Sequence, residues 1–271
     1  MNPVIFTIGN FSIRWYAVLI LIGVLLALYL INKEAKRFQI KSEFIFNLCF
    51  WAIIFGFIGA RIYYVIFNWD YYSQNLIEIV EIWKGGLAIH GGIIAGLLVI
   101  VFYTNKYHTR TIRYLDFICA AIPLAQAIGR WGNFFNSEAH GAATTLEHLQ
   151  QLHIPSFIID GMKIEGVYYT PTFFYESLAC LLLFIIIIII RRGTYRKVGT
   201  PTAIYLIGYG IIRFFIEISR TDALMLAGFK VAQIVSVIMI IIGIIILIKN
   251  AHKSKFEDLY NNANNIDQIR F

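Results

Sequence analysis

Seven apolar segments of about 20 residues each constrain the fold of this 271-residue chain more than any other feature. A helix of about 20 residues crosses roughly 30 Å of hydrocarbon, so each segment is long enough to span a bilayer. A hydrophobic fraction of 59% with only 14% charged residues is typical of membrane proteins and excludes a soluble domain. The expected spans are about 12–31, 44–67, 86–103, 116–135, 172–190, 201–219 and 230–248.

The chain is therefore predicted to be an all-α polytopic membrane protein with seven transmembrane helices, a single integral membrane domain over residues 1–271. Its basic residues alternate from loop to loop, and Lys and Arg are enriched in cytoplasmic loops. The pattern predicts an external N-terminus and a cytoplasmic C-terminus, and it assigns the net charge of +7 to anionic lipid rather than to nucleic acid. The basic, cytoplasmic segments are 32–43, 104–115, 191–200 and the tail 251–271, whereas 68–85 and 136–170 face outward.

Two segments outside the spans carry local signals. Residues 136–170 form the longest connection and are expected to make a small extracytoplasmic cap. Within it, Asp160-Gly161 lies between short apolar runs, which predicts a hairpin of two short strands. The tail 251–271 is rich in Asn and has little apolar surface, so we expect it to fray or to lie on the cytoplasmic surface.

Polar side chains concentrate where the fourth span meets its outer loop. Residues 129–141 have the sequence Gly-Arg-Trp-Gly-Asn-Phe-Phe-Asn-Ser-Glu-Ala-His-Gly. Because ionisable side chains are rare at membrane depth and usually functional there, this density predicts a functional site. The polar residues concerned are Arg130, Asn133, Asn136, Glu138 and His140.

Other spans place polar side chains at the same level. Arg61 and Arg213 each lie about six residues, roughly 9 Å, below the outer ends of the second and sixth spans. The inner half offers Asp116 alone, so the site is expected to open outward, whereas a proton or ion pathway would spread its polar groups through the whole thickness. Further groups at the outer level are Glu176, His90, Arg14 and Tyr16.

Internal charge pairing is the alternative to a binding site. Arg213 and Glu217 are spaced i,i+4, so they could neutralise each other on one helix face. Across the polar level four arginines face three glutamates, which leaves one positive charge for a phosphodiester to balance. Arginine favours phosphate recognition, since guanidinium binds phosphate oxygens bidentately and stays charged when desolvated. The groups counted are Arg14, Arg61, Arg130, Arg213, Glu138, Glu176 and Glu217.

His90 lies among glycines at the outer end of the third span. A histidine in this setting can simply make a hydrogen bond at a helix end, but a functional role is favoured because Gly91 and Gly92 would let a substrate approach the backbone. Gly56 and Gly59 in the second span, like Gly92 itself, favour tight helix packing.

No metal, cofactor or disulfide is expected. Cys49, Cys119 and Cys180 lie in or beside apolar segments without metal-ligand spacing, so we interpret them as small packing residues. His148 and His153 are spaced i,i+5 with no Glu in the metalloprotease position, which argues against a zinc site.

The polar motifs together resemble those of the prolipoprotein diacylglyceryl transferase family, bacterial enzymes that attach diacylglycerol to the lipobox cysteine of lipoprotein precursors. The similarity covers essentially the whole chain in the same order, and the family shares seven spans and an external N-terminus. The motifs are Gly129-Arg130-Trp131-Gly132-Asn133 with Asn136, Glu138 and Gly141; His90-Gly91-Gly92; Pro171 to Glu176-Ser177; and Tyr209-Gly210 with Arg213, Glu217, Arg220 and Asp222.

This resemblance implies phosphatidylglycerol as the lipid donor. The acceptor would be the lipobox cysteine thiol of a prolipoprotein signal peptide lying in the membrane. The thiol would displace glycerol phosphate and form a thioether, the first step of bacterial lipoprotein maturation. The resemblance also implies a multi-pass protein of the bacterial cytoplasmic (inner) membrane, with a site facing the outer leaflet and no cofactor.

Roles for individual residues follow from the resemblance and the charges. His90 is the expected general base, while Arg130 and Arg213 would hold the phosphate and stabilise the departing charge. Glu217 would fix Arg213. An anionic-lipid carrier or flippase, binding through the same arginines without chemistry, is the alternative. The other residues expected to bind substrate are Tyr16, Arg61, Asn133, Asn136, Glu138, Gly141 and Tyr209.

Overall fold

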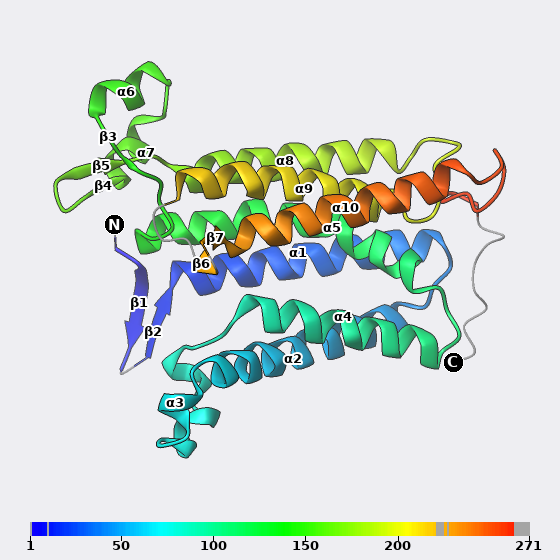
Figure 1. Ribbon diagram of the computed structural model, residues 1–271, viewed down its shortest axis with the longest axis horizontal. Helices are drawn as coiled ribbons and strands as arrows, with labels where there is room; N and C mark the ends of the chain where they lie inside the picture. The colour runs from blue at the N-terminus through cyan, green and yellow to red at the C-terminus, as the bar shows by residue number, and fades with distance from the viewer. Residues whose placement is uncertain (1, 10, 221–224, 227, 263–271) are drawn as a thin grey trace. The chain divides into compact units, whose positions relative to one another are not determined.

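The computed structural model describes residues 2–9, 11–220, 225–226 and 228–262. Within them, seven helices are long and apolar enough to cross a membrane, which confirms the predicted all-α class and number of spans (Figure 1). The largest shift is at the end of the first helix, which extends to Arg37 instead of 31. The helices are α1 (Trp15–Arg37), α2 (Ser42–Phe67), α4 (Ile89–Lys106), α5 (Thr111–Asn136), α8 (Thr172–Ile190), α9 (Thr200–Ser219) and α10 (Val231–Ala251).

The chain divides into two compact units. The first unit comprises residues 1–31 and 115–262, and the described part of the second unit is 32–114. In the first unit α5, α8, α9 and α10 lie side by side (Figure 1). Buried Cys119, Leu183 and Tyr205 belong to a common apolar core from three of these helices.

Asp116 joins two helices of the first unit at one end. Its buried carboxylate accepts hydrogen bonds from the backbone N–H of Gly199 at 2.6 Å and of Thr202 at 3.0 Å, and from the Thr202 hydroxyl at 2.6 Å. A carboxylate at a helix N-terminus satisfies N–H groups that have no partner within the helix. Asp116 of α5 therefore caps α9, which gives this acidic residue a structural role.

The N-terminus folds differently from the prediction. Residues Val4–Ile8 (β1) and Phe11–Arg14 (β2) pair as an antiparallel hairpin, so the first span begins at Trp15 rather than at about 12. β-branched and aromatic residues in both segments favour strands, and Gly9 adopts φ +58° between them. Arg14 is thus an exposed strand residue outside the helix.

The cap contains more structure than the predicted two-stranded hairpin. Asp160-Gly161 does not form the turn, because it ends helix α7 (Ser156–Gly161), which starts after Pro155. The turn is at Glu165-Gly166, where φ angles of +49° and +85° suit a two-residue hairpin loop. The other cap elements are β3 (Ala143–Thr144), α6 (Leu146–Gln151), β4 (Lys163–Ile164) and β5 (Val167–Tyr169), with sheet order β3-β5-β4.

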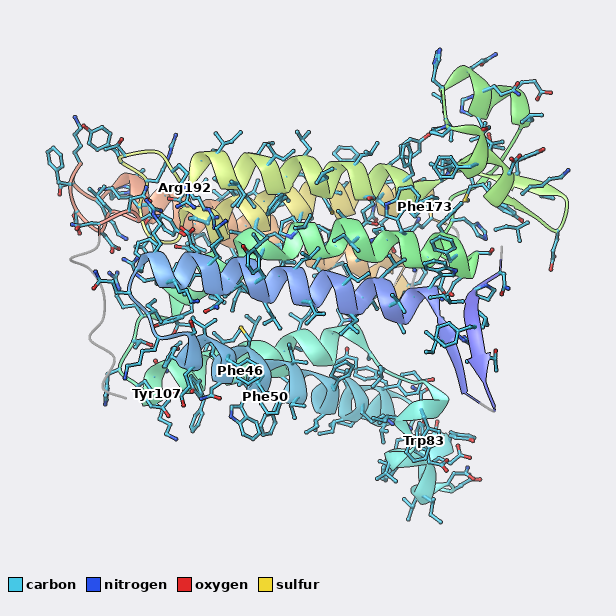
Figure 2. The ribbon with its side chains drawn as sticks, turned by 180° about the vertical axis from the view of Figure 1, so that it is seen from behind. Phe46, Phe50, Trp83, Tyr107, Phe173 and Arg192 are labelled. Carbon is cyan, nitrogen blue, oxygen red and sulfur yellow. The ribbon has the colours of Figure 1, made fainter. Side chains whose placement is uncertain are left out.

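Aromatic residues attach the cap to the ends of two spans. Phe134 from α5 and Phe173 from α8 stack with ring centroids 4.7 Å apart, and both share an apolar cluster with Leu149 and Ile158 of the cap (Figure 2). The cap core therefore continues into the helices that carry Arg130 and Glu176.

Lys230 holds the end of α9. It follows the short strands β6 (Met225–Leu226) and β7 (Phe229–Lys230), and its ammonium donates to the carbonyls of Glu217 at 2.6 Å, Ile218 at 3.2 Å and Arg220 at 3.0 Å. A cation at a helix C-terminus stabilises the unpaired carbonyls there.

The described part of the tail packs against the loop between α8 and α9. Tyr260 is fully buried, and the Lys197 ammonium donates to the carbonyls of Ser254, Lys255 and Glu257. Asn261 donates to two further loop carbonyls, at 2.9 and 3.0 Å. Up to residue 262 the tail therefore lies on the protein surface rather than fraying.

In the second unit α2 and α4 pack through glycine, as predicted. A Cβ atom on Gly91 would lie 2.4 Å from the carbonyl oxygen of Gly59, and Gly56 and Gly92 also face each other. Phe46 and Phe50 project from α2 as exposed aromatic residues, which suits a surface facing lipid (Figure 2). The connecting elements are α3 (Trp69–Tyr72), η1 (Leu76–Val80) and η2 (Ile82–Lys84).

Candidate active site

The first unit brings together two of the predicted arginines on two buried carboxylates. Arg130 Nη2 lies 2.8 Å from Glu176 Oε1, and Arg213 Nη1 lies 3.5 Å from Glu176 Oε2. Arg213 Nη2 is 2.6 Å from Glu217 Oε2. Glu176 therefore bridges guanidinium groups from two different helices.

Exposure differs between the two kinds of group. The side chains of Arg130 and Arg213 are 21% and 17% exposed, whereas those of Glu176 and Glu217 are 2% and 3% exposed. The two carboxylates are thus almost completely buried, whereas each arginine side chain keeps part of its surface accessible.

Tyr209 completes the contact between the helices. Its hydroxyl accepts from Arg130 Nη2 at 3.4 Å and donates to Glu176 Oε1 at 3.3 Å. One turn away on α9, Tyr205 stacks on Tyr209 and accepts from Gln126 Nε2 at 3.2 Å. Spacings of four residues place Tyr205, Tyr209, Arg213 and Glu217 on one face of α9.

Glu138 forms a second group of contacts at the end of α5. Its Oε1 accepts from the amide of Asn133 at 3.0 Å and from that of Asn136 at 3.3 Å. Asn133 in turn accepts from Arg130 Nη1 at 3.5 Å. Asn133, Asn136 and Glu138 are therefore connected to Arg130 through side-chain hydrogen bonds. His140 contacts the carbonyl of Gly141 and the ring of Tyr169 instead.

Tyr16 reaches this group from α1. It packs on Gly132, where an added Cβ atom would lie 2.6 Å from the tyrosine ring, and it interacts electrostatically with Glu138 and Arg130. Only glycine at this position leaves room for the ring. The conformational freedom of Gly132 is thus less important than its small size.

Hydrogen bonds between α5 and α8 fix the position of Glu176. Ser177 donates to the carbonyl of Ala127 at 2.8 Å and accepts from the Trp131 indole at 3.2 Å. Ser177 was part of the sequence motif, but its bonding partners lie 46 and 50 residues away in the chain and no spacing rule identifies them.

Gly141 is buried within the backbone that leads from the cap to α8. Its N–H donates to the carbonyl of Thr170 at 2.9 Å, and it forms an isolated bridge with Arg220. An added Cβ atom would lie 2.9 Å from Thr170 Cβ. Gly141 thus holds the cap against the end of α9, and Asp222 lies outside the described residues.

The ion pairs between arginine and glutamate change the predicted charge balance of the site. Two arginines and two glutamates form the cluster in the first unit, so its formal charge is zero rather than +1. Arg14 is exposed in β2, and Arg61 belongs to the second unit. The predicted alternative of internal pairing between Arg213 and Glu217 is therefore present.

Arg61 is bound by its own unit. The buried guanidinium donates to the carbonyls of Glu78 at 2.5 Å, Ile79 at 2.9 Å, Gly85 at 2.7 Å and Gly86 at 2.8 Å. It holds the segment that precedes α4 in a fixed conformation, and Gly86 adopts φ +76° in this segment.

His90 is the second residue of α4, and its half-buried ring faces that of Tyr63 with centroids 6.3 Å apart. The part of the glycine argument that rests on Gly91 is not supported, because Gly91 is buried against Tyr63 and Gly59. A catalytic role for His90 stays a prediction that rests on the chemistry of its imidazole ring.

Cys49, Cys119 and Cys180 are buried free thiols, as expected of packing residues. Among the residues described, no group of three His, Cys, Asp or Glu side chains is arranged to hold a metal ion. Two arginine side chains that are held at one carboxylate and keep part of their surface accessible suit the binding of an anionic group such as a phosphate.

Comparison with known proteins places these features in a family. A family model described as prolipoprotein diacylglyceryl transferase matches residues 3–249. A relative from Staphylococcus haemolyticus is 48% identical over 249 residues, 92% of this chain and 88% of the relative. One from Lactobacillus delbrueckii subsp. bulgaricus is 44% identical over 257 residues, 94% and 93% of the two chains. Both relatives are named phosphatidylglycerol–prolipoprotein diacylglyceryl transferase.

Proposed function

This chain belongs to the prolipoprotein diacylglyceryl transferase family, and from this premise we propose that it transfers the diacylglyceryl group of phosphatidylglycerol to the lipobox cysteine of a prolipoprotein. The single observation that supports this most is the Arg130–Glu176–Arg213 bridge, which holds two partly exposed arginine side chains together. Phosphatidylglycerol offers one phosphodiester, and guanidinium groups bind phosphate oxygens bidentately.

In the proposed step the acceptor sulfur attacks the glycerol carbon that bears the phosphate ester. The C–S bond forms, the C–O bond breaks, and glycerol phosphate leaves with the bonding electron pair, while the thiol proton is released to a base. Arg130 and Arg213 stabilise the negative charge that develops on the leaving phosphate.

The thiol needs activation because a free cysteine has a pKa of about 8.5 and is mostly protonated at neutral pH. His90 is the proposed base. The positive field of the arginines is the alternative activator, and the pH dependence of a His90 variant distinguishes the two.

Supporting roles follow from the contacts. Glu217 fixes Arg213 through its 2.6 Å ion pair, and Glu138 orients Asn133 and Asn136. Tyr16 and Asn133 are proposed to donate hydrogen bonds to the substrate. For the remaining predicted residues we propose indirect contributions: Tyr209 aligns Arg130 with Glu176, Gly141 holds the cap, and Arg61 holds the segment before His90.

We propose that the protein lies in the bacterial cytoplasmic membrane with its N-terminus outside, its C-terminus inside and the site facing the outer leaflet. The alternation of basic loops supports this orientation. Cysteines introduced at Gln150 and Tyr195 test it in intact cells, because an impermeant thiol reagent should label position 150 and spare position 195. The reverse pattern would contradict an outward-facing site.

One assay tests the function directly. The purified full chain is mixed with phosphatidylglycerol labelled in its acyl chains and a peptide that contains a lipobox cysteine. A labelled peptide whose lipid is joined by a thioether, together with released glycerol phosphate, is the expected result. A Cys→Ser peptide should remain unlabelled.

The same preparation in vesicles tests the lipid carrier alternative. A carrier would move labelled phosphatidylglycerol between leaflets without consuming it, and it would do so in the absence of peptide. Lipid movement without thioether product would replace the transferase proposal.

A further inference from the structure

Glu176 lies where a negative charge weakens the binding of another anion. Its carboxylate is 2.8 Å from Arg130 Nη2 and 3.5 Å from Arg213 Nη1, so it neutralises part of the charge of both guanidinium groups. Together with Glu217 it brings the formal charge of the cluster to zero. A site selected only for tight phosphate binding would not include this second carboxylate.

The proposed reaction, on which this inference rests, increases the negative charge of the bound phosphate. Phosphatidylglycerol is a phosphodiester with one negative charge, whereas glycerol phosphate is a monoester with about −1.5 to −2 charges at pH 7. Two uncompensated arginines would hold this product more strongly than the substrate. Release of the product would then become slow.

We propose that Glu176 is a positioning and specificity-determining residue that sets the spacing of the two guanidinium groups and prevents the site from binding a phosphomonoester much more tightly than a phosphodiester. Glu176 is better placed for this role than Glu217, since Glu217 pairs with Arg213 while Glu176 pairs with both arginines. Its position is further fixed by Tyr209 and by the neighbouring Ser177.

Binding measurements on the purified full chain in lipid nanodiscs test the proposal without requiring turnover. The probes are glycerol phosphate, a monoester, and glycerophosphoglycerol, the phosphodiester headgroup without acyl chains. Glu176→Gln removes one negative charge at nearly constant volume. Because electrostatic energy is proportional to ligand charge, a roughly threefold gain for the diester predicts a roughly tenfold gain for the dianionic monoester.

Two further variants separate charge from packing. Glu176→Asp keeps the charge but is too short to bridge both arginines as before, so transfer should slow while the monoester-to-diester binding ratio stays near the parental value. The control Glu257→Gln removes a charge in the tail, where the Glu257 carboxylate accepts a hydrogen bond from the backbone N–H of Ser254. It should change neither the monoester-to-diester binding ratio nor the rate of transfer.

Equal gains for monoester and diester in Glu176→Gln, or no gain for either, would overturn the proposal. Should Glu176→Gln fail to fold, the parental chain still decides, because it should bind the monoester no more than about threefold tighter than the diester; a preference above about tenfold contradicts charge compensation by Glu176. A parental chain with the expected preference but no thioether product would instead contradict the proposed transferase function.

Discussion

Arg61 and the Arg130–Arg213 pair are membrane-depth arginines with opposite surroundings. Arg61 is buried and donates to four backbone carbonyls, which are neutral and belong to the segment between α3 and α4. Arg130 and Arg213 contact carboxylates, and their side chains are 21% and 17% exposed. Arginine at this depth is thus used once to fix a backbone and once to present charge.

The comparison shows how a structural arginine differs from a binding one. A guanidinium whose donors are taken by carbonyls has little left for a ligand, and removing it leaves buried acceptors without partners. A guanidinium that contacts a carboxylate and belongs to a partly exposed side chain is better placed to meet an anionic ligand. Loss of Arg61 should therefore affect stability most, and loss of Arg130 should affect transfer most.

The largest expected effect is on stability. Arg61→Met should reduce the free energy of unfolding by about 3 kcal/mol or more, since hydrogen bonds to a charged group contribute about 1.5–3 kcal/mol each and neighbouring donors replace only some of them. Unfolding by SDS in mixed micelles measures the change. Arg14→Met, at an exposed strand position, is the matched control and should be close to parental.

Transfer by Arg61→Met, normalised to folded protein and measured at low temperature, should stay within about threefold of parental, roughly 0.6 kcal/mol. A large loss of transfer with unchanged stability would mean that Arg61 binds substrate, and the distinction between Arg61 and the Arg130–Arg213 pair would then be wrong.

His90 decides whether the second unit also takes part in chemistry. If His90 is the general base, His90→Gln should slow transfer by about 10²-fold, and the loss should shrink from pH 6.5 to 9 as a thiol of pKa about 8.5 ionises without help. The measurement is the ratio of parental to variant rates across that range. A ratio near one at every pH would leave activation to the arginine field and make the second unit a scaffold.

Arg130→Lys sharpens the binding side of the comparison. Lysine keeps the positive charge but lacks the planar fork that contacts Glu176, Tyr209 and a phosphate at once, so transfer should fall at least about tenfold, or 1.4 kcal/mol. The unfolding free energy should change little. Parental transfer rates in both Arg130→Lys and Arg130→Ala would make Arg130 a structural charge like Arg61.

Asp116→Asn should have the smallest effect, a loss of about 1 kcal/mol in unfolding free energy, because the amide keeps the shape of the α9 cap but loses the charge. Initial transfer rates at low temperature should remain near parental, since the exchange is at the opposite end of α9 from Arg213. A drop in transfer without a drop in stability would mean that the cap sets the position of the arginine pair.

The number of spans could be predicted because the length and hydropathy of a segment are local properties of the sequence. The polar level at Arg130, Arg213 and Glu176 was also predictable from depth alone, and their contacts in the first unit agree with it. The i,i+4 spacing of Arg213 and Glu217 on a predicted helix likewise predicted their ion pair.

Other features depend on partners distant in sequence. The sequence Asp160-Gly161 is compatible with a hairpin turn and with a helix end. In the structure it is a helix end, because the short helix that begins after Pro155 extends to Gly161. Arg61 looked like a ligand residue because sequence gives its depth but not the carbonyls at 78–86 that take its donors. The burial of Tyr260 likewise depends on a loop made some 60 residues earlier.

The contacts between Lys197 and the tail also limit the order in which this part of the protein can form during synthesis. Lys197 emerges from the ribosome well before its acceptor carbonyls, which lie 57 to 60 residues later, beyond α9 and α10. At about 5–20 residues per second, translation of this stretch takes roughly 3 to 12 seconds. The loop after α8 can therefore complete its contacts with the tail only after α10 and residues 254–257 have been made.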